Sequence, residues 1–148
     1  MPHRRKARRL VPHLVDWYAS HARDLPWRRA RDPYAIWVSE IMLQQTQVTT
    51  VIPYWERWMR ALPTLQKLAL AKPERVLKLW EGLGYYSRAR NLQAAAKEIV
   101  KNHDGQFPRD PAVIRALPGI GRYTAGAISS IAFGLPEPIV DGNVIRLL

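Results

Sequence analysis

Two acidic residues of this sequence stand where a hydrolytic enzyme could use them. The first is Glu40, within SEIMLQQTQV (residues 39–48), where a helix would place it one turn from Ile36, Trp37 and Leu43. Burial on an apolar face raises the pKa of a carboxyl, which then stays protonated nearer neutral pH and can act as a general acid. A structural glutamate bonded to a lysine or arginine is the alternative that this pattern leaves open.

The second acidic residue is Asp141, in PIVDGNVIRLL, between a proline-rich loop and an apolar run. This position is typical of a helix N-cap, and it also suits a carboxylate that stays ionised beside a helix N-terminus. Cleavage of a bond to a sugar anomeric carbon needs one acid for the leaving group and one carboxylate for the oxocarbenium-like centre. The hypothesis requires Glu40 and Asp141 to share a cavity.

A glycine turn in LPGIGRYTAGAI (residues 117–128) suggests an anion site. Its glycines allow a tight turn, and the helix expected to begin near Arg122 offers free N–H groups and a favourable dipole. Most such turns are ordinary, but this one joins a helix to a helix of small residues and resembles a helix–hairpin–helix DNA-binding element. The predicted phosphate-binding residues are Gly119, Gly121, Arg122 and Thr124.

The elements that must position these residues are predicted to be helices throughout, so the fold class is all-α. Many of the 12 prolines stand at expected helix starts. The apolar spacing from Leu10 to Tyr18 predicts a first helix, which ends before Leu25–Pro26–Trp27. Further helices are expected from Asp32–Pro33 to about Val51, from Pro53, from Pro63–Thr64, from Pro73, over Ser87–Asn102, from Asp110–Pro111 and from near Arg122.

Composition limits the function classes. The 148 residues allow one domain, with fragments of a second, and a net charge of +11 favours a polyanionic partner such as nucleic acid. The basic run of residues 3–9 is predicted to be a solvated, mobile tail. Without cysteine the chain cannot form disulfides or thiolate-held clusters, and its four histidines lack metal-ligand spacing. We expect an intracellular protein, since no apolar run approaches the roughly 20 residues of a membrane span.

Five motifs of this sequence resemble those of MutY-type adenine DNA glycosylases in order and approximate spacing. They are LPWR, SEIMLQQTQV, GLGYYSRARNL, LPGIGRYTAGAI and VDGNV. These enzymes belong to the helix–hairpin–helix (HhH-GPD) glycosylase superfamily. The resemblance covers the chain from about residue 10 to 148, and LQQTQV and GLGYYSRARN separate this branch from its relatives.

The resemblance implies a six-helix barrel domain over residues 25–135, with its helix–hairpin–helix at about 112–130. Residues 1–24 and 136–148 would be partial segments of a second domain, whose remainder carries four cysteines and a 4Fe–4S cluster in full-length members. We therefore expect exposed apolar surface on residues 10–22 and 136–148.

The implied function is removal of adenine mispaired with 8-oxoguanine or guanine in double-stranded DNA, after the adenine is flipped into a pocket. Glu40 would protonate adenine N7 and help to position or activate water, and Asp141 would stabilise the cationic sugar. Further matches are Tyr123 and Asn143 at the reaction centre, Arg23, Trp27, Arg28 and Leu43 in the adenine pocket, and Gln45 and Tyr85 as wedges in the DNA. Core packing is the alternative for Trp27, Leu43 and Tyr85.

Two other functions remain open. Endonuclease III-like glycosylase/AP lyases resemble this motif but carry a lysine at position 123, which forms a Schiff base that the phenol of Tyr123 cannot form. The chain could also be a non-catalytic DNA-binding fragment. We expect a monomer, located in the cytoplasm or nucleoid if the source is bacterial.

Overall fold

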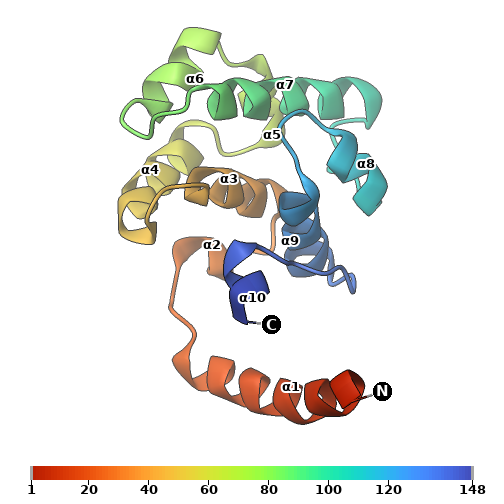
Figure 1. The fold of residues 1–148 in the computed structure, drawn as a ribbon. Coiled ribbons are helices and arrows are strands. Elements are labelled where there is room, and N and C mark those ends of the chain that lie inside the picture. The colour runs from red at the N-terminus through yellow and green to blue at the C-terminus, as the bar shows by residue number, and fades with distance from the viewer. Residues whose placement is uncertain (1, 148) are drawn as a thin grey trace.

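The computed structural model describes residues 2–147, and over this range the chain is all-α, as predicted, with no strand (Figure 1). The helices are α1 (Pro2–His21), α2 (Pro26–Arg29), α3 (Pro33–Leu43), α4 (Val48–Ala61), α5 (Leu65–Leu70), α6 (Pro73–Trp80), α7 (Ser87–Asn102), α8 (Pro111–Ala116), α9 (Arg122–Phe133) and α10 (Gly142–Leu147).

Several helices begin where the local signals predict. The side chain of Asp32 accepts a hydrogen bond from the backbone N–H of Tyr34 (3.1 Å), and Asp110 accepts one from Ala112 (2.8 Å). In both cases proline follows at the first helical position, where its missing N–H costs nothing. These caps fix the starts of α3 and α8, the helices that carry Glu40 and lead into the glycine turn.

The predicted helix from Pro33 to about Val51 is wrong in extent. Helix α3 ends at Leu43, because Gln44 is extended (φ −61°, ψ 115°) and Gln45 is left-handed (φ 57°). Helix α4 then begins at Val48 and continues through Pro53, where a new helix was expected to start. Burial of its apolar side chains Val51, Trp55 and Trp58 stabilises the helix by more than the loss of the one backbone hydrogen bond that proline removes.

Helix α3 lies at the centre of the core, packed between α4 and α9, with α5, α6 and α7 forming the far side of the body (Figure 1). Three tryptophans, Trp37, Trp58 and Trp80, are fully buried, and the rings of Trp58 and Trp80 meet edge to face at 5.8 Å. The indole N–H of Trp58 donates to the hydroxyl of Tyr34 (3.0 Å), which donates to the carbonyl oxygen of Leu62 (2.7 Å). This rigid core supports the helix that holds Glu40.

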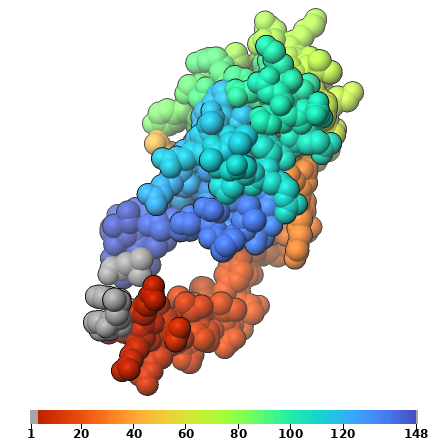
Figure 2. All heavy atoms as spheres, turned by 90° about the vertical axis from the view of Figure 1, so that its right-hand side faces the viewer, coloured from red at the N-terminus to blue at the C-terminus, as the bar shows by residue number. Residues whose placement is uncertain are grey.

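Helix α1 stands away from the other helices, joined to them by the extended residues 22–25 (Figures 1 and 2). The basic run predicted as a tail is instead part of this helix, since arginine, lysine, alanine and leucine favour helix. The expected exposed apolar surface is present: Trp17 is 58% exposed on α1, and Ile145 is 64% exposed on α10. Among the helices described, none has the length and apolar character that a bilayer crossing demands.

Candidate active site

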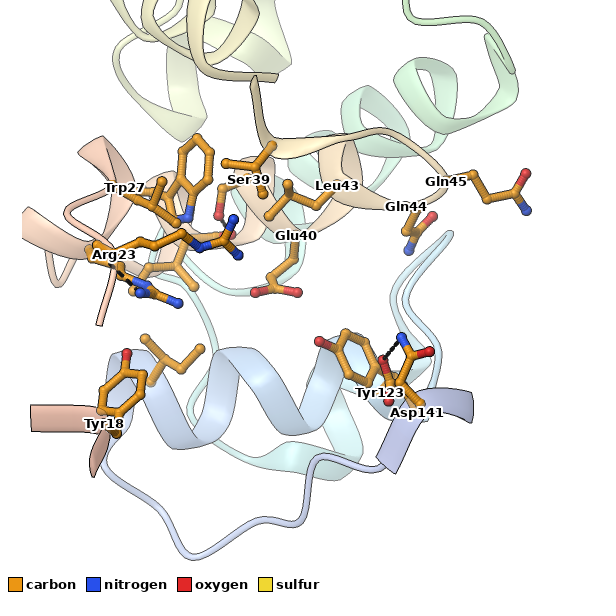
Figure 3. Close-up of a pocket in the computed structure, with 16 residues that line it drawn as sticks. Tyr18, Arg23, Trp27, Ser39, Glu40, Leu43, Gln44, Gln45, Tyr123 and Asp141 are labelled. Atoms are coloured by element: carbon orange, nitrogen blue, oxygen red, sulfur yellow. Dashed lines mark hydrogen bonds between the residues drawn. The ribbon is translucent and has the colours of Figure 1, made fainter. Parts of the chain in front are cut away.

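A cavity of about 570 Å³ opens between α2, α3, the first turn of α9 and the start of α10 (Figure 3). Nine of the predicted site residues line it, from segments far apart in the chain. They are Arg23, Trp27, Arg28, Glu40, Leu43, Gln45, Tyr123, Asp141 and Asn143. Five others lie outside it, namely Tyr85, Gly119, Gly121, Arg122 and Thr124.

Glu40 projects from α3 into this cavity (Figure 3), which Ile36 and Leu43 of the same helix also line. Trp37, expected on this face, is instead fully buried in the core. Burial raises the pKa of the Glu40 carboxyl, and the positive charge of Arg28 partly opposes that rise. Neither ion pair in the described part of the chain includes Glu40, which argues against a purely structural carboxylate.

Asp141 lines the opposite side of the cavity and also caps α10. Its Oδ1 accepts a hydrogen bond from the backbone N–H of Val144 (2.9 Å), and the amide of Asn143 donates to its Oδ2 (3.5 Å; Figure 3). Asp141 is therefore both the N-cap of α10 and a carboxylate that lines the cavity. Capping fixes the position of this carboxylate at the start of α10.

Tyr123, the second residue of α9, stands between the two carboxyl groups (Figure 3). Burial raises the pKa of its phenol, and the negative charges of Glu40 and Asp141 raise it further. Because both charges act on one phenol, the two acidic residues belong to one electrostatic environment. The packing of α9 on α3 brings Tyr123 to Glu40, and the segment after α9 brings Asp141, 101 positions from Glu40, to the same cavity.

The wall beside Glu40 comes from α2 and the residues just before it. Trp27 is buried, with its ring edge to face with Trp55 at 5.9 Å, so it both packs in the core and lines the cavity. Arg28 donates to the backbone carbonyl oxygen of Arg23 (2.9 Å), which holds both residues at the rim. Leu43 is partly buried and also contributes to both core and cavity.

Gln45 and Tyr85, the predicted wedges, occupy two turns with left-handed backbone, at φ 57° and 47°. The amide of Gln45 extends away from the cavity (Figure 3), and Tyr85 is 67% exposed. Core packing is therefore not the role of Tyr85. Both side chains are available to a partner at the surface.

The glycine turn between α8 and α9 has the geometry predicted for it at two positions. Gly119 is left-handed (φ 74°), and an added Cβ would lie 2.7 Å from the Cβ of Asn91. Gly121 is the N-cap of α9, and Arg122 is exposed beside it. The prediction that Thr124 binds phosphate is corrected by the structure, because this residue is buried. Its hydroxyl accepts a hydrogen bond from the side-chain amide of Gln44 (3.4 Å), so it joins α9 to the end of α3 instead of facing a phosphate.

Other cavity and neighbouring residues were missed from sequence. Tyr18, Ser39 and Gln44 also line the cavity, and Ser39 is fixed by a hydrogen bond to the carbonyl oxygen of Ile36 (2.6 Å). The available signal for Ser39 was its place beside Glu40, since both are polar residues in a largely apolar helix. Arg88, whose guanidinium contacts the turn that carries Gln45, gave no signal in the hydrophobic pattern.

The residues present do not fit an iron–sulfur cluster, because this chain has no cysteine to supply thiolate ligands. The described residues also contain no group of three or more histidine, aspartate or glutamate side chains able to hold a metal ion.

Comparison with solved structures places the fold among the helical DNA glycosylases. A thermostable thymine-DNA glycosylase superposes with a TM-score of 0.92 at 28% identity, covering 99% of this chain and 68% of that one. An endonuclease III–DNA complex has a TM-score of 0.83 at 24% identity, covering 97% and 66%, which supports the fold alone. Residues 38–148 match the HhH-GPD superfamily of base excision DNA repair proteins, and the chain belongs to that family.

Curated relatives include adenine DNA glycosylases, so the predicted family resemblance is confirmed. The one from Homo sapiens is 55% identical over 144 residues, which covers 91% of this chain and 26% of the relative. The one from Buchnera aphidicola subsp. Baizongia pistaciae is 47% identical over 136 residues, covering 91% and 39%. The chain thus spans well under half the length of these relatives.

Proposed function

We propose that this chain carries the catalytic site of a DNA glycosylase that hydrolyses the N-glycosidic bond of adenine mispaired with 8-oxoguanine or guanine. The observation that carries the proposal is that Glu40 and Asp141 line one cavity with Tyr123 between them. Similarity to named adenine DNA glycosylases supports the choice of adenine as the base.

The chemistry assigns a different protonation state to each acid. Glu40, which burial favours in its neutral form, donates a proton to N7 of the flipped adenine. The bond between C1′ and the base then breaks, and its electron pair leaves with adenine. The ionised Asp141 stabilises the cationic sugar, and a water adds to C1′ while its proton returns to the carboxylate of Glu40.

The cavity walls suit a planar, partly apolar base. Its volume of about 570 Å³ is in the range of small-molecule sites, and Trp27 and Leu43 give it apolar surface. Arg23 and Arg28 bring positive charge and hydrogen-bond donors to the same wall. We assign these four residues to adenine binding, and Asn143 to support of Asp141 at the reaction centre.

Double-stranded DNA is the proposed partner. The net charge of +11 favours a polyanion, and the exposed turn of Gly119, Gly121 and Arg122 offers backbone N–H groups to a phosphate. Gln45 and Tyr85 are exposed and would enter the duplex beside the mispair. We further propose a monomer that works inside the cell, in keeping with a DNA substrate.

We also propose that residues 25–135 form the six-helix barrel domain and that residues 1–24 and 136–148 belong to a second domain. The exposed apolar side chains of α1 and α10 support this division, because such surface is normally covered. In longer members of the family, that second domain would be the place of a 4Fe–4S cluster.

Two alternatives are distinguishable. An endonuclease III-like lyase is disfavoured by Tyr123, because a phenol cannot form the imine that strand cleavage needs. A non-catalytic DNA-binding role would keep duplex binding and release no adenine, so the assay below separates it from the proposed function.

A single-turnover adenine-release assay on a duplex with adenine opposite 8-oxoguanine tests the proposal. We expect the wild-type chain to release adenine and Glu40→Gln to be slower by a factor of about 10²–10⁴, with duplex binding retained. Glu56→Gln, on the exposed side of α4, is the matched control. Equal release by wild type and Glu40→Gln contradicts the catalytic assignment, and binding without release by the wild type favours the non-catalytic role.

A further inference from the structure

Two separate turns carry the proposed wedges, and both are strained. Gln45 follows the end of α3, and Tyr85 lies in the turn between α6 and α7. Each has a left-handed backbone although neither is glycine, with φ at 57° and 47°. Such conformations persist only where the surroundings hold them. Something must therefore hold each turn, and a pair of wedges also needs a fixed relation between the turns.

Arg88, in the first turn of α7, contacts both turns with one guanidinium group. Its Nη1 donates to the carbonyl oxygens of Ile41 (2.8 Å), Met42 (3.3 Å) and Gln44 (2.7 Å) at the end of α3. Its Nη2 donates to the carbonyl oxygens of Leu83 (3.2 Å) and Gly84 (3.3 Å) in the other turn. Two of the acceptor residues, Gln44 and Gly84, directly precede Gln45 and Tyr85 in the sequence.

The surroundings of Arg88 explain why an arginine stands here. The last carbonyl groups of α3 have no partner within that helix and form the negative end of its dipole. The guanidinium also lies 5.0 Å from the ring of Trp80, whose indole N–H donates to the carbonyl oxygen of Gly84 (2.9 Å). Neither ion pair in the described chain includes Arg88, so backbone dipoles compensate its charge.

We propose that Arg88 is a positioning residue, which holds Gln45 and Tyr85 in one fixed relation so that both enter the duplex together. Both of its terminal nitrogens are committed to backbone carbonyl groups, so it supports the wedges from within the protein. Lysine cannot replace it, because a single ammonium group lacks the planar fork that reaches two turns at once. The role in DNA entry rests on the proposed function, whereas the coupling of the two turns does not.

Hydrogen exchange of the backbone amides tests the coupling without DNA. We expect Arg88→Lys to speed exchange about tenfold in residues 42–46 and 83–87 together, with little change elsewhere. The matched control is Arg75→Lys, since the guanidinium of Arg75 donates to one backbone carbonyl oxygen, that of Ala61 (3.3 Å). Unchanged exchange, or faster exchange in one turn only, overturns the proposal.

A rescue experiment covers the case in which Arg88→Lys fails to fold. Glycine adopts positive φ without strain, so Gln45→Gly with Tyr85→Gly should restore folding of Arg88→Lys if strain in these turns is what Arg88 opposes. Failure of this rescue overturns the proposal in that case.

Duplex binding tests the consequence for DNA. In a Glu40→Gln background, which keeps the base in place, Arg88→Lys should weaken binding to the adenine–8-oxoguanine duplex about tenfold. With Gln45→Ala and Tyr85→Ala also present, Arg88→Lys should cause no further loss. An equal loss in both backgrounds overturns the positioning role. If the wild-type chain shows no preference for the mispaired duplex, the proposed function fails, and amide exchange still decides whether Arg88 couples the turns.

Discussion

Glu40 and Arg28 line the same cavity, and the guanidinium of Arg28 lowers the pKa of the Glu40 carboxyl that burial raises. The two effects oppose each other, with burial the larger. The carboxyl therefore stays protonated to a higher pH than an ordinary glutamate does. It also keeps a positively charged neighbour that favours release of its proton. This balance suits a group that must both donate a proton and take one back.

Removing the charge of Arg28 should shift the pH dependence of base release. In Arg28→Met the pKa of Glu40 should rise further, so the pH above which the single-turnover rate falls should move upward. The rate is measured from pH 5 to 9 at saturating enzyme, because Arg28 is also assigned to adenine binding. Arg29→Met is the control, since Arg29 pairs with Asp24 outside the cavity (2.6 Å). An unchanged or lower transition pH contradicts the proposed role of Arg28.

Stability should also depend on pH through Glu40. Its pKa in the folded protein lies above the ordinary value of 4.5, so between these two values the native state binds more protons than the unfolded state. The free energy of unfolding therefore falls as pH rises through this window, and it stays lower above it. Glu40→Gln lacks this titration, so its stability relative to wild type should increase from pH 4 to pH 7.5.

Urea denaturation at several pH values measures this difference. Glu56→Gln is the matched control for loss of one carboxylate from an exposed position. If the difference in free energy of unfolding between wild type and Glu40→Gln stays constant over this pH range, burial does not raise the pKa of Glu40.

The sequence predicts the helices of this fold where the signals are local. The caps of Asp32 and Asp110 act within a few residues, and both are present. The predicted end of this helix was wrong because the chain turns at Gln44 and Gln45. The carbonyl oxygen of Gln44 accepts a hydrogen bond from Arg88, which lies 43 positions beyond Gln45. A periodic apolar pattern carries no record of such a tertiary contact.

For the candidate site, too, the sequence predicts the residue types but not the tertiary contacts between them. The residue types of Glu40 and Asp141 suggest the chemistry. Their meeting in one cavity depends on how α9 packs on α3 and on where the segment after α9 carries Asp141. Thr124 was misplaced because its position in the glycine motif says nothing about its burial. Arg88 was missed because its partners are backbone carbonyl groups, which every residue has and no sequence pattern marks.

Position 123 should decide between base release and strand cleavage. Tyr123→Lys places an amine between Glu40 and Asp141, where it can attack C1′ and form an imine with the opened sugar. Borohydride reduction should then trap a covalent protein–DNA complex with Tyr123→Lys and none with wild type. Arg122→Lys, one residue earlier and outside the cavity, controls for an added lysine. Trapping of the wild type would favour the lyase function instead.

The close approach of Gly126 and Pro138 should control where Asp141 stands. A Cβ at Gly126 in α9 would overlap the carbonyl oxygen of Pro138, three residues before Asp141. Gly126→Ala should therefore displace the segment that carries Asp141, slow adenine release at least tenfold, and destabilise the fold by about 1–3 kcal/mol. Glu40 and the wedge turns should keep their places, so duplex affinity should change little.

Single-turnover rates, duplex titrations and thermal unfolding measure the three effects. Gly142→Ala is the control, because its added methyl group meets nothing within 4 Å. A Gly126→Ala protein with the wild-type rate would show that the position of Asp141 does not depend on this contact.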